Sequence, residues 1–245
     1  GEDCPAIQKK MAATLGLSVP NISWHASRDR LAEFTGELSL IGGCLGRIAQ
    51  EVYLLMGTEF GEVSEPYAKG IVGSSTMPHK INPTSSQHMM SCARDLRYHN
   101  AAVQEMMWVD HERNIMHSVG EMEHVEAACM AAAELLDRAD RLLAGLQVNE
   151  DNMRRNLDRL GGLTQSEHVM LELGRTIGKQ NAHELINEIA VDAYRNGKNF
   201  EAELGKDGQV SAVLSPERIH ELLDPVRYIG SCPELARQTA KRLRK

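Results

Sequence analysis

Apolar residues recur at helical spacing in three long stretches of the chain. Within each stretch they lie three and four positions apart, which places them along one face of an α-helix. The first seam consists of Leu31, Phe34, Leu38, Ile41, Leu45, Ile48, Val52 and Leu55. The second consists of Met89, Ala93, Leu96, Asn100, Val103 and Met107. The third consists of Met122, Val125, Cys129, Ala132, Leu136, Ala139, Leu143 and Leu146. The pattern predicts three helices about 30 to 45 Å long that pack nearly antiparallel in a bundle.

Small residues lie beside these apolar seams. Gly42, Gly43 and Gly46 accompany the first seam, and Ala131 and Ala133 accompany the third. Small side chains let neighbouring helices approach closely, so these helices have a second face that can be buried. Because this is more face than the bundle of one chain needs, we expect the chain to form oligomers.

The pattern changes after Leu146, where short amphipathic segments alternate with glycines. In the segment LSPERIHELLD, Ser215 can cap a helix whose first residue is Pro216. We therefore expect an all-α protein, with a long antiparallel helical bundle over 1–160 and a small C-terminal helical domain over 161–245.

Composition and charge limit the possible classes of function. The formal net charge is −7, which argues against nonspecific nucleic-acid binding. The five cysteines include no CxxC pair, so we expect reduced thiols and a cytoplasmic protein. No apolar run approaches the roughly 18 residues of a membrane span, so we expect no membrane partner. The first residues, GEDCPAIQKK, lack an initiator methionine, and we expect the chain to be a piece of a longer protein.

The longest polar connection, residues 58–83, has no helical period. Loops of this length in compact domains are usually functional or disordered. Its last part, GSSTMPHKINP (73–83), brings Ser74, Lys80 and Asn82 to the start of the second predicted helix. The helix dipole and free N–H groups there favour anions, and Lys80 adds a positive charge. The chemistry predicts a site for a carboxylate whose charge grows during reaction, with a solvated surface loop as the alternative.

Two other common sites are not predicted. The phosphate-binding motif GxxxxGK[ST] is absent. His111 and His117 flank Glu112, but the zinc motif HExxH needs its two histidines one helical turn apart, and six positions separate these two. We therefore expect no metal site.

The motif GSSxMPxKxNP resembles the signature loop of the fumarase/aspartase superfamily, which includes adenylosuccinate lyase, argininosuccinate lyase and 3-carboxy-cis,cis-muconate cycloisomerase. The resemblance extends over nearly the whole chain, through WHASRDRLAEF (24–34), DHERNIMHS (110–118), MRRNLDRLGGL (153–163) and LSPERIHELLDPVRYIG (214–230). It implies an L-aspartase/fumarase-like fold, a signature loop over 66–83, and a homotetramer whose active sites form where segments of three subunits meet.

By this resemblance, Ser74 matches the general base that removes a proton beside a carboxylate. Lys80 and Asn82 match the residues that hold the resulting aci-carboxylate, and we expect Ser75, Thr76 and Met77 to contact substrate. The reaction needs no cofactor. The family's general acid, a histidine, comes from a segment before the part that this chain matches, so no residue is assigned to it.

The residues leave the substrate open between branches of the superfamily. Trp24 and Gln87 stand where muconate cycloisomerases differ from adenylosuccinate lyases, and both favour the cycloisomerase side. Arg113 and Ser118 keep the Arg-x4-Ser spacing that reads a phosphate in adenylosuccinate lyases. We expect a small di- or tricarboxylate or a succinyl adduct as substrate.

Alternatives remain for two arginines and for the chain as a whole. Arg28 is a candidate substrate ligand or the partner of Asp29 in a buried ion pair. Arg113 is a candidate substrate ligand or the structural partner of Glu112 or Asp110. The whole chain is expected to be a lyase or cycloisomerase, with a non-catalytic structural member of the same fold as the alternative.

Overall fold

The computed structural model describes residues 1–22, 24–66, 76–77, 80–113 and 115–244. The chain forms two compact units, Gly1–Asn149 and Glu150–Lys245. The boundary between the units lies in the sequence directly before helix α5 (Glu150–Asp158), whereas the sequence interpretation began its second domain at residue 161. Helices dominate both units, and the all-α fold class is confirmed.

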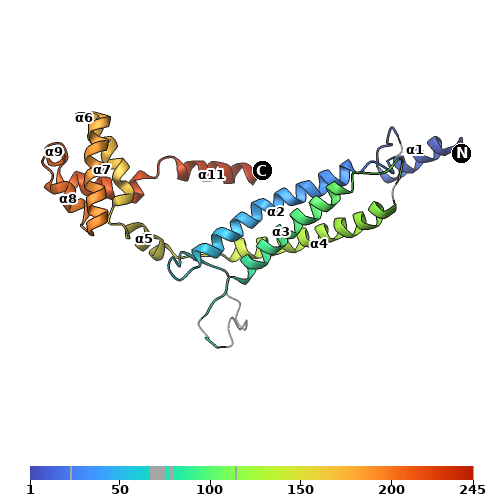
Figure 1. Cartoon of the computed structure of the whole chain (residues 1–245), viewed down its shortest axis with the longest axis horizontal. Helices are drawn as coiled ribbons and strands as arrows, with labels where there is room; N and C mark the ends of the chain where they lie inside the picture. The colour runs from blue at the N-terminus through green and yellow to red at the C-terminus, as the bar shows by residue number, and fades with distance from the viewer. Residues whose placement is uncertain (23, 67–75, 78–79, 114, 245) are drawn as a thin grey trace. The chain divides into compact units, whose positions relative to one another are not determined.

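The first unit is built around three long helices that lie side by side (Figure 1). They are preceded by one shorter helix, and the set is α1 (Cys4–Leu15), α2 (Asp29–Leu55), α3 (Thr84–Glu105) and α4 (Ile115–Gly145). A hydrogen bond of 3.1 Å joins Thr35 Oγ1, near the start of α2, to Asn100 Oδ1, near the end of α3. Because the start of one helix meets the end of the next, α2 and α3 run antiparallel, as predicted.

The face that α2 buries within the unit is its small-residue face. Its buried residues are Ala32, Thr35, Gly42, Ala49 and Val52. A Cβ added at Gly46 would lie 2.8 Å from the Cβ of Ala93 on α3, so the two backbones approach closely there. The predicted seam of α2 therefore faces the bundle only in part: Val52 is buried and the four leucines of the seam are half-buried, because the helices pack most closely where side chains are small. Three members of that seam stay exposed, Phe34, Ile41 and Ile48.

The other two seams had different outcomes. On α3 the prediction is confirmed, since Met89, Ala93, Leu96 and Val103 are buried; Met107 alone lies beyond the end of the helix and is exposed. On α4 the buried stripe is Ala128, Ala132, Leu135, Ala139 and Leu142. This stripe shares only its two alanines with the predicted seam and otherwise lies one position earlier, so Leu136 and Leu143 are exposed. Periodicity located the helix but not which of two adjacent apolar stripes faces inward.

A two-stranded antiparallel ladder joins the connection after α2 to the connection after α4. Strands β1 (Val63–Ser64) and β2 (Gln147–Val148) pair Val63 with Val148 and Ser64 with Gln147. The backbone N–H of Asn149 extends this contact by donating to the carbonyl of Glu62 at 2.8 Å. The chain that leads toward the signature loop is therefore fixed at the end of α4.

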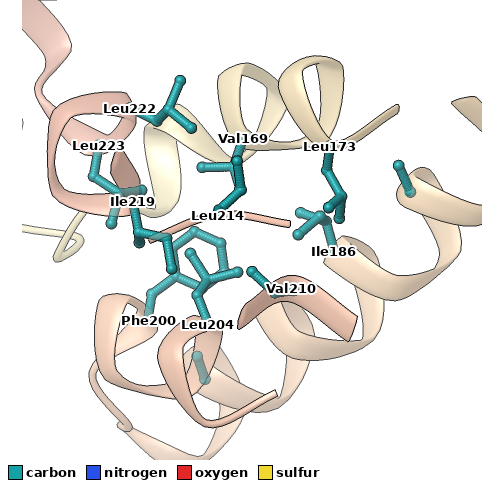
Figure 2. Close-up of a cluster of buried hydrophobic side chains, with 12 residues drawn as sticks. Val169, Leu173, Ile186, Phe200, Leu204, Val210, Leu214, Ile219, Leu222 and Leu223 are labelled. Carbon is teal, nitrogen blue, oxygen red and sulfur yellow. The ribbon is translucent and has the colours of Figure 1, made fainter. Parts of the chain in front are cut away.

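The second unit packs short helices around one apolar core. Its elements are α5, η1 (Leu163–Gln165), α6 (Ser166–Ile177), α7 (Lys179–Asn196), α8 (Phe200–Lys206), α9 (Gly208–Ser211), α10 (Pro216–Leu223), η2 (Pro225–Tyr228) and α11 (Cys232–Leu243). Figure 2 shows side chains of α6, α7, α8 and α10 meeting around Phe200. Ser215 caps α10 by accepting a hydrogen bond from the backbone N–H of Arg218 at 3.2 Å, so the predicted cap is confirmed.

Helix α2 is long and apolar enough, by length and composition, to cross a membrane. The sequence interpretation expected no membrane span because no uninterrupted apolar run approaches about 18 residues. A core helix of a soluble protein meets the same criteria, and α2 packs its small-residue face against α3 and α4. The absence of a membrane partner stays a prediction.

Candidate active site

The described site residues predicted from the sequence fall into two groups at opposite ends of the long helices. Lys80 and Asn82 directly precede α3, and Glu65, after β1, contacts the first turn of α3. Arg28 directly precedes α2, and it contacts Ser118 in the first turn of α4. Helix α2 spans 27 residues between the two ends, or about 40 Å at the α-helical rise. We call the two groups the loop end and the arginine end.

At the loop end, the structure describes part of the predicted residue set. Ser74 and Ser75 lie outside the described residues. Thr76, Met77 and Lys80 are exposed, and Asn82 is half-buried. The backbone N–H of Lys80 donates to the carbonyl of Met77 at 3.0 Å. The described residues thus place a cation and an amide together, directly before α3.

The N-terminus of α3 already holds a carboxylate, that of Glu65. Its Oε2 accepts a hydrogen bond from the N–H of Ser85 at 3.0 Å, and its Oε1 accepts from the N–H of Ser86 at 2.7 Å. The hydroxyl of Ser86 donates to the same Oε1 at 2.7 Å. The expectation that free N–H groups at this terminus hold a substrate carboxylate was therefore wrong. Among the described residues directly before α3, Lys80 carries a positive charge.

At the arginine end, Arg28 is buried in an ion pair with Glu121 of α4. Its Nη2 also donates to the hydroxyl of Ser118 at 3.3 Å. Of the two alternatives for Arg28, a buried ion pair is found, but its partner is not Asp29. Asp29 instead accepts a hydrogen bond from Ser27, which lowers the pKa of its carboxyl below the ordinary value. The structure thus brings two predicted substrate ligands together, Arg28 and Ser118, and both also have structural partners.

The remaining predicted residues of this end are open to solvent. Trp24 is 62 % exposed, and its ring stacks on that of His25, with centroids 5.4 Å apart and planes 11° apart. Arg113 is exposed in the turn between α3 and α4. The same turn contains His111, which has a positive φ of 53°. At the arginine end, the indole of Trp24 and the guanidinium of Arg113 are thus both exposed.

Comparison with known proteins identifies the family. The model for the family Lyase matches residues 4–97, and the model for the adenylosuccinate lyase C-terminus matches residues 162–239. The chain is 39 % identical over 234 residues to N-acetyl-S-(2-succino)cysteine lyase of Dickeya dadantii, covering 96 % of this chain and 52 % of that protein. It is 40 % identical over 230 residues to 3-carboxy-cis,cis-muconate cycloisomerase of Pseudomonas aeruginosa, covering 94 % and 50 %. The chain belongs to the fumarase/aspartase superfamily.

A solved member of this superfamily has the same fold. The crystal structure of 3-carboxy-cis,cis-muconate lactonizing enzyme from Pseudomonas putida superimposes with a TM-score of 0.89 at 34 % identity, covering 100 % of this chain and 54 % of that one. The resemblance inferred from the signature motif is thereby confirmed. The chain spans about half the length of the curated relatives it matches.

The sequence interpretation missed two acidic residues of this chain that contact the candidate site residues or the helix beside them. Glu65 caps a helix that begins 19 positions later in the sequence, and Glu121 neutralises Arg28 from another helix. A local signal existed only for Glu65: Pro83 stands at the N-cap position of α3 and makes no side-chain cap hydrogen bond, so the cap had to come from elsewhere. For Glu121 the sequence contains no comparable signal.

Proposed function

We propose that this protein is a lyase that removes a proton beside a substrate carboxylate and expels the β-substituent, most like 3-carboxy-cis,cis-muconate cycloisomerase. The observation that carries this proposal is the intact motif GSSTMPHKINP in a chain of the fumarase/aspartase superfamily. Similarity at 40 % identity to a cycloisomerase supports the choice of branch.

The chemistry follows from the residues of the motif. Ser74 Oγ takes the proton from the carbon beside the carboxylate, and the electron pair of that C–H bond forms the new C=C bond. The bond to the β-substituent breaks, and the departing group takes a proton from a general acid that the family resemblance places outside this chain. Lys80 and Asn82 hold the carboxylate as negative charge builds on it. A preorganised cation and an amide donor lower the barrier because they stabilise this developing charge.

A serine hydroxyl is a weak base and must be deprotonated to act as one. The positive end of the α3 dipole favours deprotonation of Ser74 less than the sequence suggested, because the carboxylate of Glu65 accepts hydrogen bonds from the N–H groups there. The positive charge of Lys80 is therefore the main described feature that favours the alkoxide form of Ser74.

We propose that the active site is completed between copies of the chain in a homotetramer. The loop end and the arginine end lie about 40 Å apart along α2, which is too far for one small carboxylate substrate to span. The exposed apolar side chains Phe34, Ile41, Ile48, Leu136 and Leu143 form stripes on α2 and α4 that further helices can cover. The five cysteines are unpaired, which fits the proposed cytoplasmic location.

A second candidate reaction is elimination from a succinyl thioether. Similarity at 39 % identity to an N-acetyl-S-(2-succino)cysteine lyase favours it. The same residues would act, with the C–S bond in place of the bond broken by a cycloisomerase. Release of fumarate and AMP from adenylosuccinate is a weaker alternative, because Ser118, expected to read the phosphate, accepts a hydrogen bond from Arg28.

The test is ultraviolet absorbance of the purified full-length protein with 3-carboxy-cis,cis-muconate, N-acetyl-S-(2-succino)cysteine and adenylosuccinate in separate reactions. We expect loss of the muconate absorbance. Turnover of either succinyl adduct would keep the elimination chemistry and change the branch. A folded tetramer that turns over none of the three would favour the non-catalytic alternative and contradict the proposal.

Ser74→Ala is the matching variant. Loss of the base is expected to lower kcat by about 10² to 10⁴-fold, the usual contribution of a general base, while the midpoint of thermal unfolding changes little. Circular dichroism and the same absorbance assay measure the two quantities. Retained activity would show that Ser74 is not the base.

A further inference from the structure

Glu65 is a buried carboxylate that joins two points of the chain on either side of the signature loop. Its side chain is 8 % exposed, and it lies directly after β1. Its three hydrogen bonds, of 2.7 to 3.0 Å, all go to Ser85 and Ser86 in the first turn of α3. Residues 66–83 therefore start beside Glu65 and end at the helix that Glu65 caps.

These contacts complete the hydrogen bonding at the start of α3. The N–H of Thr84 donates to the carbonyl of Asn82 at 2.8 Å, and the N–H of Gln87 donates to the carbonyl of Pro83 at 3.0 Å. Glu65 accepts the two N–H groups between them. The bond of Gln87 is the first regular i→i−4 bond of α3, and Pro83 has no N–H, so the three N–H groups that lack an intrahelical partner at this end, those of Thr84, Ser85 and Ser86, are all used. The positive end of the helix dipole thus faces an internal anion.

The segment that carries Glu65 is itself held firmly. Val63 is buried and pairs with Val148 in the two-stranded ladder. Pro66 packs against Gly145 at the end of α4, where an added Cβ would lie 2.6 Å from the Cβ of Pro66. Glu65 therefore links the first turn of α3 to a fixed part of the unit, rather than to a solvated strand.

We propose that Glu65 is a positioning residue for the carboxylate-binding group of the signature loop. Lys80 and Asn82 lead directly into the turn that Glu65 fixes, so the carboxylate determines where these two residues stand relative to β1 and α4. Because the carboxylate of Glu65 also occupies the N–H groups at the N-terminus of α3, it directs the substrate anion to Lys80 and Asn82 and away from that terminus. This role rests on the proposed elimination chemistry, in which Lys80 and Asn82 hold the developing charge.

The variant that tests this role is Glu65→Gln, which keeps the length of the side chain. The amide removes the negative charge and turns an NH₂ group toward N–H donors, so at least one of the three hydrogen bonds is lost. We expect kcat to fall by about tenfold or more with a smaller change in KM. The reason is that displacement of a charge-stabilising group reduces the stabilisation of the transition state more than that of the ground state.

Ser85→Ala is the matched control, since Ser85 contacts Glu65 only through its backbone N–H. This variant is expected to keep kcat within about twofold of the unchanged protein. Glu65→Asp, which keeps the charge on a shorter side chain, is expected to recover part of the loss. All variants are assayed at a temperature at which circular dichroism shows them folded, so that a loss of stability does not count as a loss of rate.

Hydrogen exchange of the backbone amides of Ser85 and Ser86 provides a readout that does not depend on activity. We expect faster exchange in Glu65→Gln and unchanged exchange elsewhere in α3. Unchanged exchange, or faster exchange with an unchanged kcat, would overturn the positioning role. If the unchanged protein turns over no substrate, the proposed function fails, and exchange still decides whether Glu65 fixes the start of α3.

Discussion

Arg28 illustrates at the scale of single residues how a contact distant in sequence decides a side chain's role. It stands next to Asp29, but its ion-pair partner is Glu121 on another helix. Both side chains of this pair are 9 % exposed, so each charge depends on the other for compensation. A stabilised Arg28 that also contacts Ser118 gives the arginine end a fixed geometry.

Replacing one partner of this pair is expected to be costly. Glu121→Gln leaves the buried guanidinium of Arg28 without a compensating charge, and we expect the free energy of unfolding to fall by about 3 to 5 kcal/mol. Denaturant unfolding measures it. Glu123→Gln, at an exposed position two residues along α4, is the control and is expected to change stability by less than about 0.5 kcal/mol. Equal effects of the two variants on the free energy of unfolding would show that Glu121 does not stabilise the fold through its ion pair with Arg28.

Caps show which residue-scale features the sequence can reveal. Ser215 caps α10 from the position directly before it, and the sequence predicts this because the donor lies three residues away. Glu65 caps α3 from across a loop, so Pro83 signals that a cap is needed but no local pattern identifies Glu65 as its source. Side chains that act on their own turn are predictable from the sequence, whereas those that act across a fold need the fold.

At the scale of elements, the choice between two packing faces decides the form of the bundle. The sequence predicted all three long helices, because their periodicity is strong, but it assigned the inward face of α2 to the larger side chains. The observed contact uses the small ones, with Gly42 and Gly46 against Leu96 and Ala93. The large apolar face is then left for other copies, as the proposed tetramer requires.

A pair of glycine variants on α2 tests this assignment. Gly46→Ala adds a Cβ 2.8 Å from that of Ala93, and we expect a net loss of about 1 to 2 kcal/mol, because overpacking outweighs the gain in helix propensity. Gly43→Ala, one turn away, meets no atom within 4 Å and is expected to stabilise the chain by about 0.5 to 1 kcal/mol. Urea unfolding of both variants decides the matter, and a stabilised Gly46→Ala would show that the small-residue face is not the packed one.

At the scale of the whole molecule, the signature motif predicted the superfamily and the all-α fold, and both are confirmed. The periodicity of the sequence did not show that the candidate site residues lie at two opposite ends of the long helices; only the family resemblance implied a site built from several subunits. The family resemblance implied that residues such as Lys80 and Arg113 serve one site through different subunits, without giving their separation within one chain. Within one chain, the antiparallel arrangement of α2, α3 and α4 separates them by about the length of a helix.

Subunit complementation tests most directly the claim that the active site is completed between copies. Lys80→Ala and Arg113→Ala are each expected to be nearly inactive alone, since each removes one end of every site. Unfolding and refolding the two variants together should restore a clear fraction of the native activity, because some sites then receive an intact loop end from one copy and an intact arginine end from another. A mixture that stays inactive, although native mass spectrometry detects hybrid tetramers, would contradict a shared site.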